Sequence, residues 1–127
     1  MNASDLNRLL RGDFNGEDLK SKIFEEVSTY SQLMNKKGSS IPLNFNEDED
    51  LTIDNTALQN LLSEALAERL SNYDLAYICD CLSMGERVSY SNERVQEVIF
   101  EIADPDINGL VSKLDLNTLI EECKTIL

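Results

Sequence analysis

The sequence predicts an all-α fold: a compact bundle of about five to six helices with one long acidic loop, built as a single domain over residues 1–127. Three observations support this prediction. Aliphatic residues recur at intervals of three and four along most of the chain, as on the buried face of a helix. Capping residues, mostly Ser, Asp and Gly, separate these periodic segments. The hydrophobic fraction of 42% is large enough to form a core at this length.

The N-terminal part of the chain predicts two helices. The first runs from about Ser4, its expected N-cap, to Arg11, and a glycine-containing turn follows it. The second runs from about Glu17 to Lys36 and ends at Gly38. Its apolar stripe advances by three or four residues at each step, through Leu19, Ile23, Val27, Tyr30 and Met34.

Residues 38–53 form the main irregular stretch that we expect. Pro42 is incompatible with a helix interior, and the four consecutive acids from Glu47 to Asp50 repel one another in a compact form. Phe45 precedes these acids and is either a plug that packs the loop onto the body or an exposed anchor for a partner. We therefore expect the long acidic loop here.

Two further helices follow the acidic loop. Asp54 is the expected cap of a helix that extends to about Leu70. Ser71 or Asn72 opens the next helix, and Gly85 ends it. The apolar residues of this second helix share one face and are Leu75, Ile78, Cys79 and Leu82.

The C-terminal part predicts two more helices after a short extended stretch. Residues 88 to 90 alternate apolar and polar, which suits a short strand or an extended connector, and we favour the connector. Ser91 is the expected cap of the next helix, and Asp104 ends it because it precedes a proline. The last helix begins near Ser112 or Asp115.

The segment of residues 104–115 resembles the EF-hand calcium loop, in which oxygen ligands recur at short intervals around a hard cation. The residues at the ligand positions would be Asp104, Asp106, Asn108, Leu110 (through its carbonyl), Ser112 and Asp115. The alternative is a turn between helices, with a capping box at its end. The last ligand is Asp instead of Glu, and no second loop pairs with this one. We favour the turn and expect neither metal nor cofactor.

The charge balance excludes several function classes. The formal net charge is −13, from 24 acidic and 11 basic residues, and the chain has no histidine. Such an excess of acid repels nucleic acid and anionic membranes, and it attracts basic proteins. The missing histidines remove the commonest general base and metal ligand. We therefore expect a binding protein with no catalytic activity.

The cysteines and the N-terminal residues suggest a cytoplasmic protein. The sequence starts with neither a basic nor an apolar run, and no segment is apolar enough to span a bilayer. The cysteine count of three is odd, and Cys79-x-Cys81 is not a redox or zinc motif. We expect Cys79 and Cys123 to be buried apolar residues on helix faces.

Two clusters of acids beside apolar or aromatic residues are the expected binding surface, because aromatic anchors within a polar rim dominate many interfaces. The first cluster consists of Phe45, Glu47, Asp48, Glu49 and Asp50. The second consists of Tyr73, Asp74, Tyr77 and Asp80. For Phe45 and Tyr77, packing into the body is the alternative.

With this character, and with the segments Leu70–Ile78, Glu86–Tyr90 and Asp104–Gly109, the chain resembles the immunity proteins of bacterial contact-dependent growth inhibition systems. The resemblance implies a non-catalytic inhibitor that binds the C-terminal domain of a cognate toxin and blocks its active site. That domain is often a basic nuclease that cleaves tRNA or DNA. A nuclease gathers positive charge to hold phosphates, so an acidic inhibitor can be attracted to the same surface.

Overall fold

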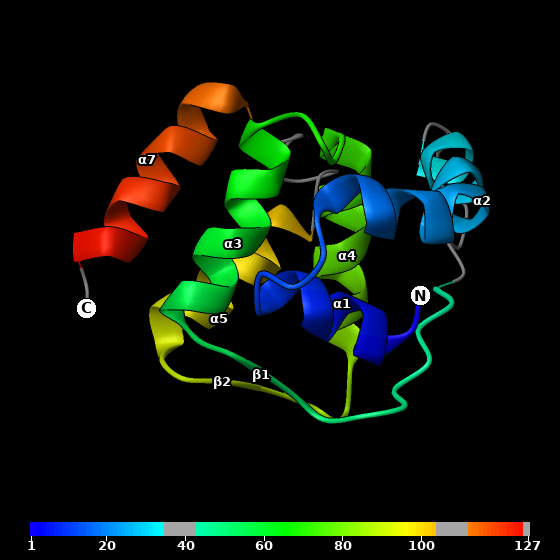
Figure 1. Ribbon diagram of the computed structural model, residues 1–127, viewed down its shortest axis with the longest axis horizontal. Helices are drawn as coiled ribbons and strands as arrows, with labels where there is room; N and C mark the ends of the chain where they lie inside the picture. The colour runs from blue at the N-terminus through cyan, green and yellow to red at the C-terminus, as the bar shows by residue number, and fades with distance from the viewer. Residues whose placement is uncertain (35–42, 104–111, 126–127) are drawn as a thin grey trace.

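The structure is a computed structural model that describes residues 1–34, 43–103 and 112–125, and it confirms the all-α bundle (Figure 1). In this part of the chain, six helices surround one core, and two three-residue strands lie at one side. The elements are α1 (Ala3–Leu10), α2 (Gly16–Met34), β1 (Leu51–Ile53), α3 (Asn55–Leu66), α4 (Asn72–Met84), β2 (Val88–Tyr90), α5 (Glu93–Ile102) and α7 (Lys113–Thr125).

Helix α4 is the most buried helix of the bundle. It packs between α2 and α5, while α3 packs against α1 and α7. Leu75, Ile78 and Leu82 are all buried, as their spacing predicts. Burying a side chain of this size contributes about 1.5–3 kcal/mol. The predicted apolar stripe of α2 is also buried at Leu19, Ile23, Val27 and Tyr30.

Local caps begin several helices where the sequence predicts them, with two corrections. Asp54 caps α3 by accepting the N–H of Ala57 at 2.7 Å. Ser71 and Asp74 form a reciprocal capping box at the start of α4. The cap of α5 is Asn92, one residue after the predicted Ser91. Ser4 is not a cap, because α1 already begins at Ala3.

Helix α3 ends earlier than predicted, at Leu66 instead of near Leu70. The chain leaves the helix at Glu68, whose φ of 64° lies in the left-handed region. The N–H of Glu68 donates to the Ala65 carbonyl, and the N–H of Arg69 donates to the Glu64 carbonyl. These two bonds form a Schellman motif, which satisfies carbonyls at the helix end. The apolar spacing continues past residue 66 to Leu70, so the spacing alone does not reveal that α3 ends at Leu66.

The two strands correct the prediction of an irregular stretch through residue 53 and of a connector at 88–90. Leu51 pairs with Val88 and Ile53 pairs with Tyr90 in a parallel register. Parallel neighbours need a long crossover, and here α3 and α4 provide it. The alternation at Leu51-Thr52-Ile53 buries both aliphatic side chains and exposes the threonine. A strand of three residues is too short for its alternation to be distinctive in the sequence.

Spanning a bilayer requires a long apolar helix, and none occurs in the described part of the chain. The predicted end of the second helix at Lys36 and the predicted boundary at Asp104 lie outside the described residues. Cys79, Cys81 and Cys123 are free and buried, which confirms the prediction for Cys79 and Cys123.

Candidate functional site

The acids of the first predicted cluster belong to a segment, residues 43–54, that lies against the body of the protein. Near its middle, the Glu47 carboxylate accepts the backbone N–H groups of Glu86 at 3.2 Å and Arg87 at 2.8 Å. The Arg87 side chain in turn donates to the Glu47 carbonyl and to the Asp50 carboxylate, both at 2.7 Å. The hydrogen bond to Asp50 raises the pKa of Arg87. Residues 86 and 87 therefore hold both ends of the acid run.

The other two acids of the run contact α1. The Asp48 carboxylate accepts the hydroxyl of Ser4 at 2.6 Å and its backbone N–H at 2.9 Å. Glu49 accepts the side-chain N–H of Asn7 at 2.9 Å. These contacts place α1 and segment 43–54 side by side, although more than 30 residues separate them in the sequence.

Tyr77 joins the start of the same segment to the core. Its ring is buried, and its hydroxyl accepts the backbone N–H of Asn44 at 3.1 Å and donates to Glu26 at 2.6 Å. Burial and the hydrogen bond to Glu26 raise the pKa of Tyr77. Tyr77, a member of the second predicted cluster, is therefore an interior residue. Its hydroxyl binds the backbone of Asn44, near the start of the segment that holds the first cluster.

The remaining residues of the second predicted cluster lie elsewhere on α4. Asp74 is buried in the capping box and lies 3.9 Å from the Lys20 ammonium. Tyr73 is half-buried against the core. Both belong to the first turn of α4, about 15 Å along the helix from Met84. Asp80 is half-buried and hydrogen-bonded to the Tyr30 side chain. Segment 43–54 and the first turn of α4 are therefore two separate parts of the protein, and the two predicted clusters do not form one continuous surface.

A pocket of about 350 Å³, lined mainly by apolar residue types, opens where residues 43–47 meet the end of α4. We call it the Met84 pocket; it is lined by Leu43, Phe45, Glu47, Cys81, Met84 and Gly85. Met84 is 71% exposed, and Phe45 is half-buried against the core. A Cβ atom at position 85 would lie 3.2 Å from the Phe45 ring and 2.9 Å from Glu47 Oε1, so the missing side chain of Gly85 admits both residues.

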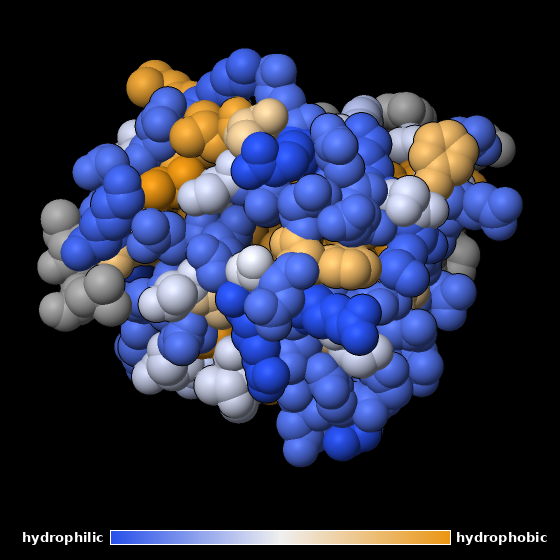
Figure 2. Space-filling view, viewed as in Figure 1, coloured by the Kyte–Doolittle hydropathy of each residue, from blue (hydrophilic) through white to orange (hydrophobic). Residues whose placement is uncertain are grey.

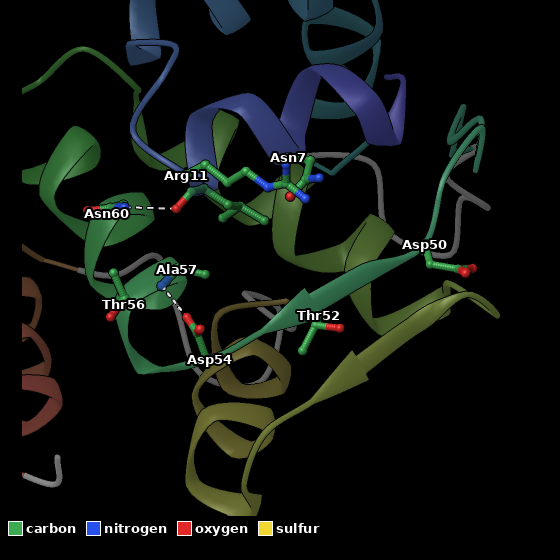
Figure 3. A pocket seen from close by; sticks show the side chains of 9 residues that line it. Asn7, Arg11, Asp50, Thr52, Asp54, Thr56, Ala57 and Asn60 are labelled. Carbon is green, nitrogen blue, oxygen red and sulfur yellow. Dashed lines mark hydrogen bonds between the residues drawn. The ribbon is translucent and has the colours of Figure 1, made fainter.

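A second pocket, of about 320 Å³, lies at the other end of the segment between α1, β1 and α3 (Figure 3). We call it the Asn60 pocket; its lining is mostly polar and consists of Asn7, Leu10, Arg11, Asp50, Thr52, Asp54, Thr56, Ala57 and Asn60. Segment 43–54 therefore lines the Met84 pocket at one end and the more polar Asn60 pocket at the other.

The face of the molecule shown in Figure 2 is predominantly hydrophilic, with small separate apolar areas over α7 and α2. The exposed large apolar residues of those helices are Leu114 and Phe24. Met84 differs from both because it lines a pocket. Among the described residues, the Met84 pocket is where an exposed apolar side chain and the acid run occur together.

Four of the six residues of the calcium-loop prediction, Asp104, Asp106, Asn108 and Leu110, lie outside the described residues. The other two bond to each other at the start of α7. The Asp115 N–H donates to the Ser112 hydroxyl at 3.2 Å, and the Ser112 N–H donates to the Asp115 carboxylate at 3.3 Å. This is the reciprocal capping arrangement that the turn alternative predicts. Elsewhere, no three side chains of His, Cys, Asp or Glu gather into a metal-binding group within the described ranges.

Comparison with protein-family models, curated proteins and solved structures finds no match for this chain. The site therefore has to be interpreted from its own residues. The sequence prediction missed Met84, Gly85 and Arg87 as parts of the surface around the acid run. It also missed the polar pocket, because its walls come from three elements that only tertiary packing brings together.

Proposed function

We propose that this protein is a non-catalytic inhibitor that binds a basic partner, the cognate toxin domain of a growth-inhibition system, through segment 43–54 and its two pockets. One observation carries the proposal. All four acids of the run 47–50 are fixed to the body by bonds from α1 and from residues 86 and 87, directly beside the Met84 pocket. Acid and apolar groups are therefore presented together on an ordered surface.

Electrostatics favours this function. A net charge of −13 accelerates encounter with a positively charged protein, and the effect weakens as salt screens it. The ordered segment adds a second advantage. Immobilising a loop on binding costs free energy, and here the folded chain has already fixed residues 44–50. Charge thus supports rapid association, and preorganisation supports affinity.

The Met84 pocket supplies the apolar part of the interface. Tight interfaces place apolar anchors in a central pocket and surround them with polar groups. Leu43 and Phe45 are apolar residues of its lining, and Glu47 is the charged residue of that lining. An apolar side chain flanked by lysine or arginine complements this arrangement. The partner we propose is therefore a basic domain with an exposed apolar side chain near its positive surface.

The first experiment measures binding of the full chain to the basic domain encoded by the neighbouring upstream gene, by isothermal titration calorimetry over a range of salt concentrations. We expect nanomolar affinity that decreases as salt increases. We also expect co-expression of this chain to rescue cells from the toxin domain. The proposal is wrong if the two proteins form no complex at low salt and growth is not rescued.

A matched pair of variants locates the interface. Met84→Ser removes the apolar side chain of the pocket, and we expect at least about tenfold weaker binding. Leu114→Ser is the control, because Leu114 is 75% exposed at the first turn of α7, on the far side of α3 from segment 43–50 (Figure 1). We expect this variant to bind like the wild type. If the two substitutions changed the binding affinity equally, the Met84 pocket would not be part of the interface.

The calcium-binding alternative predicts a different result. A calcium site at residues 104–115 gives a heat of binding that Asp104→Ala abolishes. Ser112 and Asp115 form the two hydrogen bonds of a capping box at the start of α7, and this contact favours the turn. A flat calorimetric titration with calcium at millimolar concentration would dispose of the alternative.

A further inference from the structure

We propose that the Asn60 pocket receives the guanidinium group of an arginine side chain from the partner protein. The inference rests on the proposed function and specifies the chemistry at one end of the same surface. It follows from the shape of the pocket, the hydrogen-bond acceptors of its lining residues, and the negative charge of the chain.

The pocket is a hollow with walls from three elements. Figure 3 shows Asn7 on α1 and Arg11 directly after it at one side, Thr56 and Asn60 on α3 at another, and β1 along the third. Its volume of about 320 Å³ accommodates a long side chain.

The donors of the pocket are partly used within the chain. Asn60 donates from its side chain to the Leu10 carbonyl at 2.8 Å, and Asn7 donates to Glu49 at 2.9 Å. Each of these two bonds leaves the side-chain carbonyl oxygen of its asparagine as an acceptor. Asn7 and Asn60 therefore each keep one amide oxygen outside these two bonds.

The strand and the helix cap add further acceptors. The β1–β2 pairing uses the N–H of Leu51 and the carbonyl of Ile53. In a parallel ladder, residues alternate between bonding toward one neighbour and away from it, so the backbone N–H and carbonyl of Thr52 are directed away from β2. Thr52 lines the pocket. Asp54, another lining residue, uses Oδ1 to cap α3, and this bond leaves its Oδ2 as an acceptor.

The charge of the chain favours a cation, since its net charge is −13. Within the pocket, Asp54 supplies a carboxylate and Arg11 supplies the cation of the lining. Asp50 also lines the pocket, but its carboxylate is paired with Arg87. A guanidinium group carries five N–H donors in a rigid plane, and it can reach acceptors on several walls at once. An ammonium group presents a compact point charge and matches spread acceptors less well.

The test uses the full chain labelled with ¹⁵N and titrated with N-acetyl-arginine amide, with N-acetyl-citrulline amide as the neutral isostere. We expect the arginine compound to shift the amide signals of Thr52, Thr56 and Ala57 and the side-chain signals of Asn7 and Asn60. The citrulline compound should leave them in place. An N-acetyl-lysine amide titration should show weaker binding than the arginine compound.

Two variants with opposite expected effects make the test independent of folding defects. Asp54→Asn keeps a capping side chain but removes one charge, and we expect arginine binding to weaken about three- to tenfold. Arg11→Gln removes the competing cation, and we expect binding to strengthen. An anion site would show the reverse pattern, and a neutral polyol site would show little change in either variant.

The inference is overturned if the arginine compound shifts no pocket signal, or if citrulline shifts the same signals equally. These outcomes are distinguishable from failure of the proposed function, because they need no partner protein. A complex with the basic domain that forms normally with Asp54→Asn and Arg11→Gln would leave the function intact and remove this pocket from the interface.

Discussion

The carboxylate of Asp48 caps helix α1 by accepting both the backbone N–H and the hydroxyl of Ser4, at 2.9 Å and 2.6 Å. The residue at the cap position of α1, Asn2, makes no such side-chain bond. A distant acid therefore satisfies an N–H group that a local residue usually satisfies. One residue of the acid run thus stabilises the fold as well as contributing to the charge of the surface.

This contact predicts a pH-dependent stability. The hydrogen bonds from Ser4 lower the pKa of Asp48 below its usual 3.8. A carboxyl with a lowered folded-state pKa contributes stability above its unfolded value and loses it as pH falls through the folded value. We expect Asp48→Ala to lower the urea midpoint at neutral pH and to have a much smaller effect near pH 2. Asp13→Ala, in the exposed turn after α1, is the control. An equal effect of Asp48→Ala at both pH values would contradict the role of its charge.

Tyr77→Phe tests how segment 43–54 is attached. The change removes a hydroxyl that bridges Glu26 and the Asn44 N–H, so we expect a loss of about 1–3 kcal/mol in unfolding free energy. Hydrogen exchange at the Asn44 amide should become faster. In Tyr90→Phe, the lost bond is a longer one to the Leu82 carbonyl, at 3.3 Å, and we expect a smaller cost. A Tyr77→Phe protein with wild-type stability and exchange would show that this bridge does not hold the segment.

Gly85→Ala tests the contact between the acid run and the end of α4. The added Cβ would lie 2.6 Å from Val88 Cγ2 and 2.9 Å from Glu47 Oε1, so the segment must shift. We expect a cost of about 1–3 kcal/mol, measured by urea denaturation. Met84→Ala, at the exposed neighbouring position, should stay within about 0.5 kcal/mol of the wild type. If Gly85→Ala were as stable as the wild type, the residues around Gly85 would be able to move aside without a cost in stability.

Glu68→Gly should stabilise the protein. Glu68 ends α3 with a φ of 64°, a conformation in which glycine has no steric penalty. The change also breaks an ion pair with Lys113, but both side chains are largely exposed and such pairs contribute little. We expect a melting temperature a few degrees higher, measured by circular dichroism. Glu68→Ala keeps the strain and loses the ion pair, so it should give no such gain.

The three cysteines should react slowly in the folded protein. Burial raises the pKa of Cys81 to about 12, and it also raises the pKa of Cys79 and Cys123. The thiolate is the reactive form, so little of it is present at pH 8. We expect slow reaction with Ellman's reagent under native conditions and rapid reaction of all three thiols in urea. Fast labelling of the native protein would show that a cysteine is accessible.

The sequence determined the helices of this protein well, because their signals are local. Apolar spacing identified the buried face of α2 and the central face of α4, and Asp54 and Ser71 begin helices where their capping chemistry predicts. It was less successful at endings and strands. Glu68 adopts a left-handed conformation without being glycine, and three-residue strands carry too little alternation to be distinctive.

Tertiary structure alone decided how the acidic segment is used. The sequence showed four adjacent acids and an aromatic in an irregular stretch, but their partners Ser4, Asn7 and Arg87 are all distant along the chain. Hydrogen bonds between distant residues leave no periodic pattern. The same reason hid both pockets, whose walls belong to separate elements. The sequence therefore determined which acidic and aromatic residues the segment contains, and contacts between distant residues determined where their side chains lie.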